Sequence, residues 1–317
     1  MKILVTGGSG LIGKAIQTKY KTITPQHTFT FLSSKDGDLR DYDTVYNLFE
    51  RINPDIVIHL AANVGGLYKN MNQKVDMITD NLSINMNVLK CCHLFNIIKC
   101  FCCLSTCIFP DKTEYPINES MLHNGPPHAS NSGYAYAKRM MEVLCKAYND
   151  QYAKNFVCII PTNIYGKFDN FSLKDGHVIP SLIHQCYLAK KQNKPFVIKG
   201  TGRALRQFIY SEDLATIILY MIDYYHSVDS MVLSVSEQEE VSMQTLGIQI
   251  AKLFGVDNIH FDTSFSDGQY KKTADNTKCM KFLTKDVSQS SFTFTPIEEG
   301  LKETVNWFIE NIDTIRK

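Results

Sequence analysis

Short apolar runs alternate with longer stretches of helical character along the first half of the chain. The runs lie at residues 2–6, 28–32, 55–60, 100–105 and 155–160, and the third is almost continuously apolar (Asp-Ile-Val-Ile-His-Leu). Strands of a parallel sheet are buried on both faces and show this character. Strands that alternate with helices predict an α/β protein with a Rossmann-type doubly wound parallel sheet. The clearest intervening helices are expected from Leu11, over about 73–98 and from Ser132 to 151.

The alternation becomes less regular after about residue 165. We expect a helix from Pro180, a strand before Gly200, a strand and a helix within 206–228 with Ser211 as the N-cap, and later elements at 231–234, 242–253 and 297–313. We therefore predict a Rossmann domain over residues 1–165, to which residues 206–228 return. A smaller C-terminal α/β lobe should then occupy most of residues 166–317.

A glycine-rich turn follows the first strand directly, with glycines at positions 7, 10 and 13. Gly7 permits a tight turn, Gly10 lets a pyrophosphate approach the backbone, and Gly13 lets the helix pack on the strand. The helix that begins at Leu11 and Ile12 would point its N-terminus at the anion. The alternative is a plain tight turn, but the spacing is typical of the short-chain dehydrogenase/reductase superfamily.

The end of the second strand indicates which dinucleotide binds. Enzymes specific for NAD usually place an acidic residue there, to bind the ribose 2′-hydroxyl. This chain has Ser33, Ser34 and Lys35, which would suit a 2′-phosphate and favour NADP; the alternative is a polar loop with nothing bound. Asp38 and Leu39 are placed to contact the adenine.

Ser105, Tyr134 and Lys138 are expected at the carboxyl edge of the sheet, where they could polarise and protonate a substrate carbonyl group. Tyr134 and Lys138 are four apart on one helix and therefore share a face. We predict that the lysine lowers the pKa of the phenol, which would then supply a proton during hydride transfer. Ser105, at the end of the fourth strand, could donate a second hydrogen bond to a substrate carbonyl.

Cys107 and His177 allow two interpretations. A single cysteine in a cysteine-rich chain is usually a packing residue, and a single histidine in a loop is usually surface. A thiol and an imidazole also have the pKa values needed to exchange protons beside a ketone. The residues alone leave both interpretations open.

Composition excludes several classes of function. The formal net charge is +1, so no basic excess indicates nucleic acid or anionic lipid. No apolar run approaches about twenty residues, and the N-terminal run is short for a signal peptide, so we expect no membrane partner and a cytoplasmic protein. The ten cysteines are then better interpreted as buried thiols than as disulfides. Cys100 and Cys103 have no second ligand pair at zinc-finger spacing, and no metal is expected.

Four longer motifs carry a resemblance to a known family. They are Ser-Thr-Cys-Ile-Phe-Pro-Asp at 105–111, the loop and helix start at 123–139, Pro-Thr-Asn with Asp-Asn-Phe at 161–171, and Asp-Gly-His-Val-Ile-Pro at 175–180. Together with the N-terminal turn they resemble the GDP-L-fucose synthases, which are GDP-4-keto-6-deoxy-D-mannose 3,5-epimerase/4-reductases. The similarity covers nearly the whole chain.

The resemblance implies a reaction and a set of site residues. Cys107 would remove the protons at C3 and C5 of the keto sugar, His177 would return them, and NADPH would reduce C4 with Tyr134 as proton donor. Substrate binding is expected at Asn163, His177, Val178, Arg206 and Lys272. Cofactor binding is expected at Gly7, Gly10, Leu11, Ile12, Gly13, Ser33, Ser34, Lys35, Asp38, Leu39, Ala61, Ala62, Tyr134, Lys138, Pro161, Asn163 and His177. Some bacterial members carry arginine where this chain has Ser9 and Gln185. The product would be GDP-L-fucose, and members are homodimers.

Three other readings compete with this one. Sugar-nucleotide 4,6-dehydratases place acidic residues directly after the serine or threonine of the fourth strand, whereas this chain has Thr106, Cys107 and Ile108. UDP-hexose 4-epimerases retain NAD and have no use for a Cys/His pair. A non-enzymatic NADP-sensing regulator on the same fold would typically lack the Tyr134/Lys138 pair.

Overall fold

Six strands form one parallel sheet, as the alternation of apolar runs predicts. The computed structural model describes the chain apart from residues 268, 288–291 and 317. Each neighbouring pair of strands in the sheet is parallel. The sheet order is β10-β5-β4-β3-β1-β2, formed by β1 (Lys2–Thr6), β2 (Thr28–Phe31), β3 (Ile56–His59), β4 (Lys99–Cys103), β5 (Phe156–Pro161) and β10 (Met231–Leu233). The order reverses direction beside β1, and doubly wound sheets bind ligands at such a point, outside the carboxyl ends of the strands.

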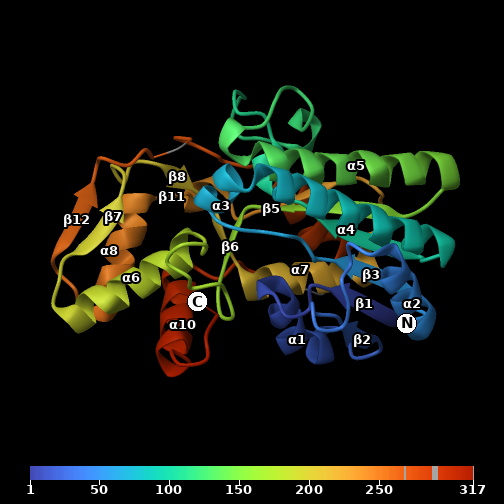
Figure 1. Cartoon of the computed structure of the whole chain (residues 1–317), viewed down its shortest axis with the longest axis horizontal. Helices are drawn as coiled ribbons and strands as arrows, with labels where there is room; N and C mark the ends of the chain where they lie inside the picture. The colour runs from blue at the N-terminus through green and yellow to red at the C-terminus, as the bar shows by residue number, and fades with distance from the viewer. Residues whose placement is uncertain (268, 288–291, 317) are drawn as a thin grey trace.

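Helices cover both faces of this sheet (Figure 1). One face packs on α1 (Leu11–Ile23) and α7 (Ser211–Tyr224). The other packs on α2 (Tyr42–Ile52), α4 (Lys74–Leu94) and α5 (Ser132–Tyr152). Successive residues of a strand point to opposite faces. In β3, accordingly, Ile56 and Ile58 enter the first core and Val57 the second.

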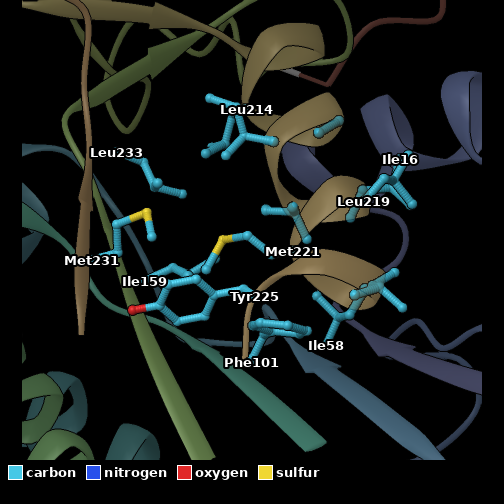
Figure 2. Packing of buried hydrophobic residues seen from close by; sticks show 14 of the residues in the cluster. Ile16, Ile58, Phe101, Ile159, Leu214, Leu219, Met221, Tyr225, Met231 and Leu233 are labelled. Carbon is cyan, nitrogen blue, oxygen red and sulfur yellow. The ribbon is translucent and has the colours of Figure 1, made fainter. Parts of the chain in front are cut away.

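Helix α7 is apolar nearly all round because it is buried between the sheet, α1 and the C-terminal segment. Figure 2 shows its Leu214 and Met221 directed toward Ile159, Met231 and Leu233 of the sheet. α7 (Ser211–Tyr224) thus lies against the main sheet, whereas Arg206 and Phe208–Tyr210 pair with strands outside it. β10, which lies beyond residue 228, also belongs to the main sheet, because it pairs with β5. The division of the chain at residue 165 remains a prediction.

The rest of the chain builds a smaller group of elements around its own core, which includes Phe171, Ile183, Phe196 and Phe308. Two parallel pairs and one antiparallel pair of short strands occur here. The strands are β6 (Asn163–Tyr165) with β9 (Phe208–Tyr210), β7 (Phe196–Lys199) with β12 (Ile259–Asp262), and β8 (Leu205–Arg206) with β11 (Val241–Ser242). The helices are α6 (Val178–Gln192), α8 (Met243–Phe254) and α10 (Ile297–Glu310).

Some local elements differ from the sequence predictions. α2, α3 (Leu67–Asn72), α9 (Thr277–Lys281) and the adjoining π-turn (Phe282–Asp286) were not anticipated. α2 carries clear end signals, since Asp41 accepts the backbone N–H of Thr44 and Asn53 closes the helix with φ 46°. Tyr210, not Ser211, is the N-cap of α7, and the buried Ser211 Oγ has no hydrogen-bond partner in the described part of the chain.

Short 3₁₀ turns at Thr106–Ile108, Glu119–Met121, Ala129–Asn131 and Glu237–Glu239 complete the described elements. In the described ranges, no helix combines the length and the apolar character that a membrane span requires.

Candidate active site

The glycine turn between β1 and α1 lies against the end of β3. Gly7 has φ +70°, and a Cβ on it would lie 2.8 Å from the backbone nitrogen of Ala61. A Cβ on Gly13 would lie 2.6 Å from the carbonyl oxygen of Gly7. Gly10 is the N-cap of α1, where no side chain caps the helix end. Backbone groups, with no side chain over them, therefore surround the N-terminus of α1 at Leu11 and Ile12. A pyrophosphate binds to such a helix N-terminus.

A buried polar network that sequence reasoning missed supports this turn. Thr6 Oγ1 accepts the N–H of Ala61 at 3.2 Å and donates to His59 Nδ1 at 2.8 Å. The other ring nitrogen of His59 then donates to Asn85 Oδ1 at 3.1 Å. Burial lowers the pKa of His59 to about 4, so the ring is neutral and takes this tautomer. The network fixes the backbone at Ala61, next to Ala62.

Two asparagines of α4 also support this region. Asn81 and Asn85 are both buried, and the amide of Asn81 bonds to the backbone N–H and carbonyl of Asn63. These bonds order the segment that follows Ala62 and leads to Gly66.

The loop after β2 presents the residues predicted to bind a 2′-phosphate. Ser34 and Lys35 are exposed. The hydroxyl of Ser33 donates to Asp36 at 2.8 Å, a carboxylate that sequence reasoning did not weigh. Asp38 pairs with Arg40 at 2.8 Å, and Leu39 is half-buried beside it. Ser34 and Lys35 are thus the groups available to a phosphate here.

Ser105 and Cys107 lie together because the chain makes a 3₁₀ turn directly after β4. The oxygen of Ser105 accepts the backbone N–H of Cys107 at 3.4 Å. Burial raises the pKa of the Cys107 thiol, and the Lys272 ammonium, the Ser105 hydroxyl and the Lys138 ammonium oppose that rise. Of the ten cysteines this is the one not fully buried, and all ten are free thiols.

Tyr134 and Lys138 share the face of α5 that meets the end of β4. Lys138 Nζ donates to the carbonyl oxygen of Cys103 at 2.7 Å and lies 5.8 Å from the centroid of the Tyr134 ring. The predicted lowering of the phenol pKa was wrong for this arrangement. Burial, with Cys107 and Cys103 as neighbours, holds the pKa of Tyr134 well above its usual value. Tyr134 is therefore a protonated phenol at neutral pH, which is the form that donates a proton.

Two cations, Arg206 and Lys272, lie near each other, with Lys272 close to the thiol, and neither forms an ion pair within the described part of the chain. Arg206 donates to the carbonyl oxygens of Leu205, Gln269 and Tyr270 at 2.6, 2.6 and 3.2 Å. Burial and the proximity of Arg206 lower the pKa of Lys272. Like charges held close in a partly buried place favour an anion between them.

We call residues 269–275, which carry Lys272, the strap. Gln207, a residue that sequence reasoning missed, is buried and exchanges two hydrogen bonds with the backbone of Ala274, at 2.7 and 3.1 Å. The hydroxyl of Tyr115 donates to the carbonyl of Lys271 at 2.7 Å. These bonds hold the strap beside the loop that follows Cys107.

The remaining predicted residues occupy the ends of β5 and α6. Pro161 ends β5, and Asn163 donates to the carbonyl of Gln207 at 2.9 Å. His177 is the N-cap of α6, followed by an exposed Val178. The His177 side chain is 53% exposed and its Nδ1 is 4.0 Å from Asp169 Oδ1. No hydrogen bond or ion pair joins it to Ser105, Cys107, Tyr134 or Lys138 in the described chain.

The two thiols of the Cys-x-x-Cys pair do not lie together in the structure. Cys100 and Cys103 point to opposite faces of β4 and enter different cores. Within the part of the chain that the structure describes, no three His, Cys, Asp or Glu side chains gather as a metal ion would require.

Comparisons with known proteins agree with this geometry. The model of the NAD dependent epimerase/dehydratase family matches residues 3–234. A GDP-L-fucose synthase of Dictyostelium discoideum is 52% identical over 99% of this chain and 97% of its own length. GDP-L-fucose synthase 1 of Arabidopsis thaliana is 30% identical over 98% of this chain and 94% of its own. The crystal structure of a GDP-L-fucose synthetase from Naegleria fowleri bound to NADP superimposes with a TM-score of 0.92 at 48% identity, covering 100% of this chain and 95% of that one.

Proposed function

The chain belongs to the NAD dependent epimerase/dehydratase family and, within it, to the GDP-L-fucose synthases, and from this membership we propose that it converts GDP-4-keto-6-deoxy-D-mannose to GDP-L-fucose. The observation that carries the proposal is the group of side chains gathered at the end of β4. It combines the reductase residues Tyr134 and Lys138 with a thiol, Cys107, beside Ser105.

NADP(H) is the cofactor, and the residues of the first strands fit it. The pyrophosphate is held at the glycine turn, where a side chain on Gly7 or Gly13 would collide with neighbouring backbone. Ser34 and Lys35 bind the 2′-phosphate, and Asp38 with Leu39 borders the adenine. When bound, NADPH supplies the hydride that reduces C4 of the sugar.

Epimerisation comes first and uses Cys107. Its thiolate removes the proton from C3, releases it to solvent and then removes the proton from C5, and each time the electron pair moves into the C4 carbonyl to give an enolate. The hydroxyls of Ser105 and Tyr134 donate hydrogen bonds to that oxygen, which stabilises its negative charge. His177 donates a proton to each carbon on the opposite face of the ring and regains one from solvent between the two steps.

Reduction follows at C4. Tyr134 gives its phenolic proton to the carbonyl oxygen, and its raised pKa keeps the phenol protonated until the oxygen becomes basic. Lys138, close to the ring, stabilises the phenolate that forms.

The nucleotide end of the substrate is held by the second group of elements. Arg206 and Lys272 face the diphosphate, because two cations held close to each other favour an anion between them. Asn163 and Val178 border the sugar.

The direct test is to add GDP-4-keto-6-deoxymannose with NADPH or NADH and identify the product. We expect GDP-L-fucose with one NADPH consumed per sugar, and slower turnover with NADH. A dehydratase or 4-epimerase would consume no NADPH, and an NADP-sensing regulator would bind NADPH without turnover; each result would refute the proposal.

The protein is proposed to be a cytoplasmic homodimer. Its ten cysteines are free thiols, which suits a reducing compartment. Apolar side chains lie exposed on the outer faces of α4 and α5, among them Val75, Met86, Met140 and Val143. A second copy that covers these faces would form a four-helix contact.

A further inference from the structure

Asp169 is a buried carboxylate beside the imidazole of His177. It follows β6, and the residue is 2% exposed. Its Oδ1 accepts the N–H of Asn170 at 2.7 Å and lies 4.0 Å from His177 Nδ1. Its Oδ2 is buried without a hydrogen-bond partner among the residues that the structure describes.

A buried carboxylate such as that of Asp169 lowers the stability of the folded protein. A carboxylate removed from water without full hydrogen bonding is costly, and buried unpaired polar atoms in native proteins call for an explanation. Burial raises the pKa of Asp169, while His177, the N–H of Asn170 and Arg316 oppose that rise. The nearest ion-pairing group is the half-exposed ring of His177.

The arrangement orients the histidine ring. Nδ1 is the nitrogen that faces Asp169, so Nε2 lies on the other edge of the ring. The 4.0 Å separation is that of an ion pair and not of a hydrogen bond, so the carboxylate acts on the protonated ring through its charge and favours the orientation that presents Nε2 for proton transfer. The 53% exposure of the side chain leaves that edge accessible to a substrate.

We propose that Asp169 is a positioning residue, which holds Nδ1 of His177 so that Nε2–H returns the protons to the sugar carbons. The inference rests on the function proposed above. In each return the N–H bond of Nε2 breaks and a C–H bond forms at C3 or C5. The enolate electron pair makes the new bond, the ring becomes neutral, and Asp169 stays ionised and compensates the charge of the imidazolium before transfer.

The test compares Asp169→Asn with a matched control, Asp175→Asn, which makes the same chemical change in the loop of His177. Both are assayed in deuterated water with GDP-4-keto-6-deoxymannose and NADPH. We expect Asp169→Asn to lower kcat for inverted product by about 10²-fold, within the range for general acid–base catalysis, with KM nearly unchanged. Asp175→Asn should match the unsubstituted protein.

A double variant separates positioning from a direct role. If Asp169 acts through His177, then His177→Gln combined with Asp169→Asn should be no slower than His177→Gln alone. Asp169→Glu should recover part of the rate, because it restores the charge. Additive losses in the double variant would overturn the proposal.

The melting temperature distinguishes a positioning role of Asp169 from a purely structural one. Asparagine keeps an oxygen for the N–H of Asn170 and removes a buried charge, so the melting temperature should hold or rise. A fall in melting temperature that parallels the loss of activity would show that Asp169 only supports the fold. If the unsubstituted protein forms no GDP-L-fucose, the proposed function fails; if it does and Asp169→Asn is equally fast, the role of Asp169 fails.

Discussion

At the scale of single residues, environment sets chemical role. Tyr134 and Cys107 are half-buried neighbours near the end of β4, and desolvation raises the pKa of both. For the phenol this preserves the proton it must donate. For the thiol it opposes formation of the base, and the Lys272 and Lys138 ammonium groups, the Ser105 hydroxyl and a backbone hydrogen bond counteract it. The two halves of the reaction should therefore respond differently to substitution and to pH.

Tyr134→Phe should separate reduction from epimerisation. The variant lacks the proton donor for C4 but keeps Cys107 and Ser105. NADPH oxidation should fall by about 10²–10⁴-fold, while sugar protons still exchange with deuterated water. Absorbance of NADPH and mass spectrometry of the sugar measure the two processes. Loss of exchange together with oxidation would contradict the two-stage scheme.

Exchange at C3 should rise with pH, because the raised pKa of Cys107 leaves little thiolate at neutral pH. Lys272 is the cation that most strongly lowers the pKa of Cys107. Lys272→Met removes it, so the midpoint of the pH–rate curve for exchange should shift to a pH about one unit higher. The measurement is the exchange rate between pH 6 and 10 with saturating sugar. Lys271→Met is the control, since its ammonium lies 3.8 Å from Glu240. An identical profile in both variants would remove Lys272 from the activation of the thiol.

At the scale of elements, the site depends on how closely α1 approaches β1 and β3. Gly7 and Gly10 of the turn and Gly13 of α1 have different tasks in the structure. Gly7 and Gly13 have no room for a Cβ, whereas a Cβ on Gly10 would meet its first neighbour at 3.3 Å, with an ordinary φ of −78°. Gly10 is therefore needed by the ligand more than by the fold.

Substitution by alanine should reveal this difference. Gly13→Ala should destabilise the protein by several kcal/mol, in the range of overpacking, because the helix must move away from backbone atoms. Gly10→Ala should fold with a nearly unchanged melting temperature but bind NADPH at least about tenfold more weakly, because its methyl group occupies the anion cradle. Thermal melts measure the stability of each variant, and fluorescence titration measures its affinity for NADPH.

Gly255→Ala is the control for these variants. It also has a positive φ (+65°), but nothing lies within 4 Å of an added Cβ. It should lose about 1 kcal/mol of stability, with cofactor affinity unchanged. Equal NADPH affinity in Gly10→Ala and Gly255→Ala would mean that the turn does not bind the pyrophosphate.

At the scale of the whole molecule, later parts of the chain complete the site that earlier parts begin. α7 lies in the core of the main sheet, and the strap is held by Gln207 and Tyr115 beside the Cys107 loop. The exposed apolar faces of α4 and α5 belong to the helices that also carry Tyr134, Lys138 and Asn85. Association through these faces would thus brace the helices behind the site.

Met140→Glu should convert the proposed dimer to a monomer. Met140 is 49% exposed and lies on α5 with Tyr136 and Val143, at the i, i+4 and i+7 spacing of one face. A charge there would be buried on association, which is unfavourable without a partner. Sedimentation velocity measures the mass. Ile309→Glu on α10, 46% exposed, is the control and should leave the mass unchanged. A monomeric unsubstituted protein would refute the dimer.

The sequence by itself determined the first five strands of the sheet, the glycine turn and the residues of the reductase pair, because each depends on spacing that is local along the chain. The period of apolar positions gives the strands, and four residues between Tyr134 and Lys138 place them on one helix face. The roles of Cys107 and His177 could not be predicted from these residues alone and came from the resemblance of longer motifs to a known family.

Only the tertiary structure decided what depends on distant segments. Asp169, His59 and Gln207 are ordinary polar residues in the sequence, and their importance arises from burial and from partners brought together by folding. The pKa of Tyr134 was mispredicted for the same reason: a charge one helical turn away can be read from the sequence, whereas desolvation by the surrounding chain cannot. Local spacing sets which groups are present, and burial sets the form in which they act.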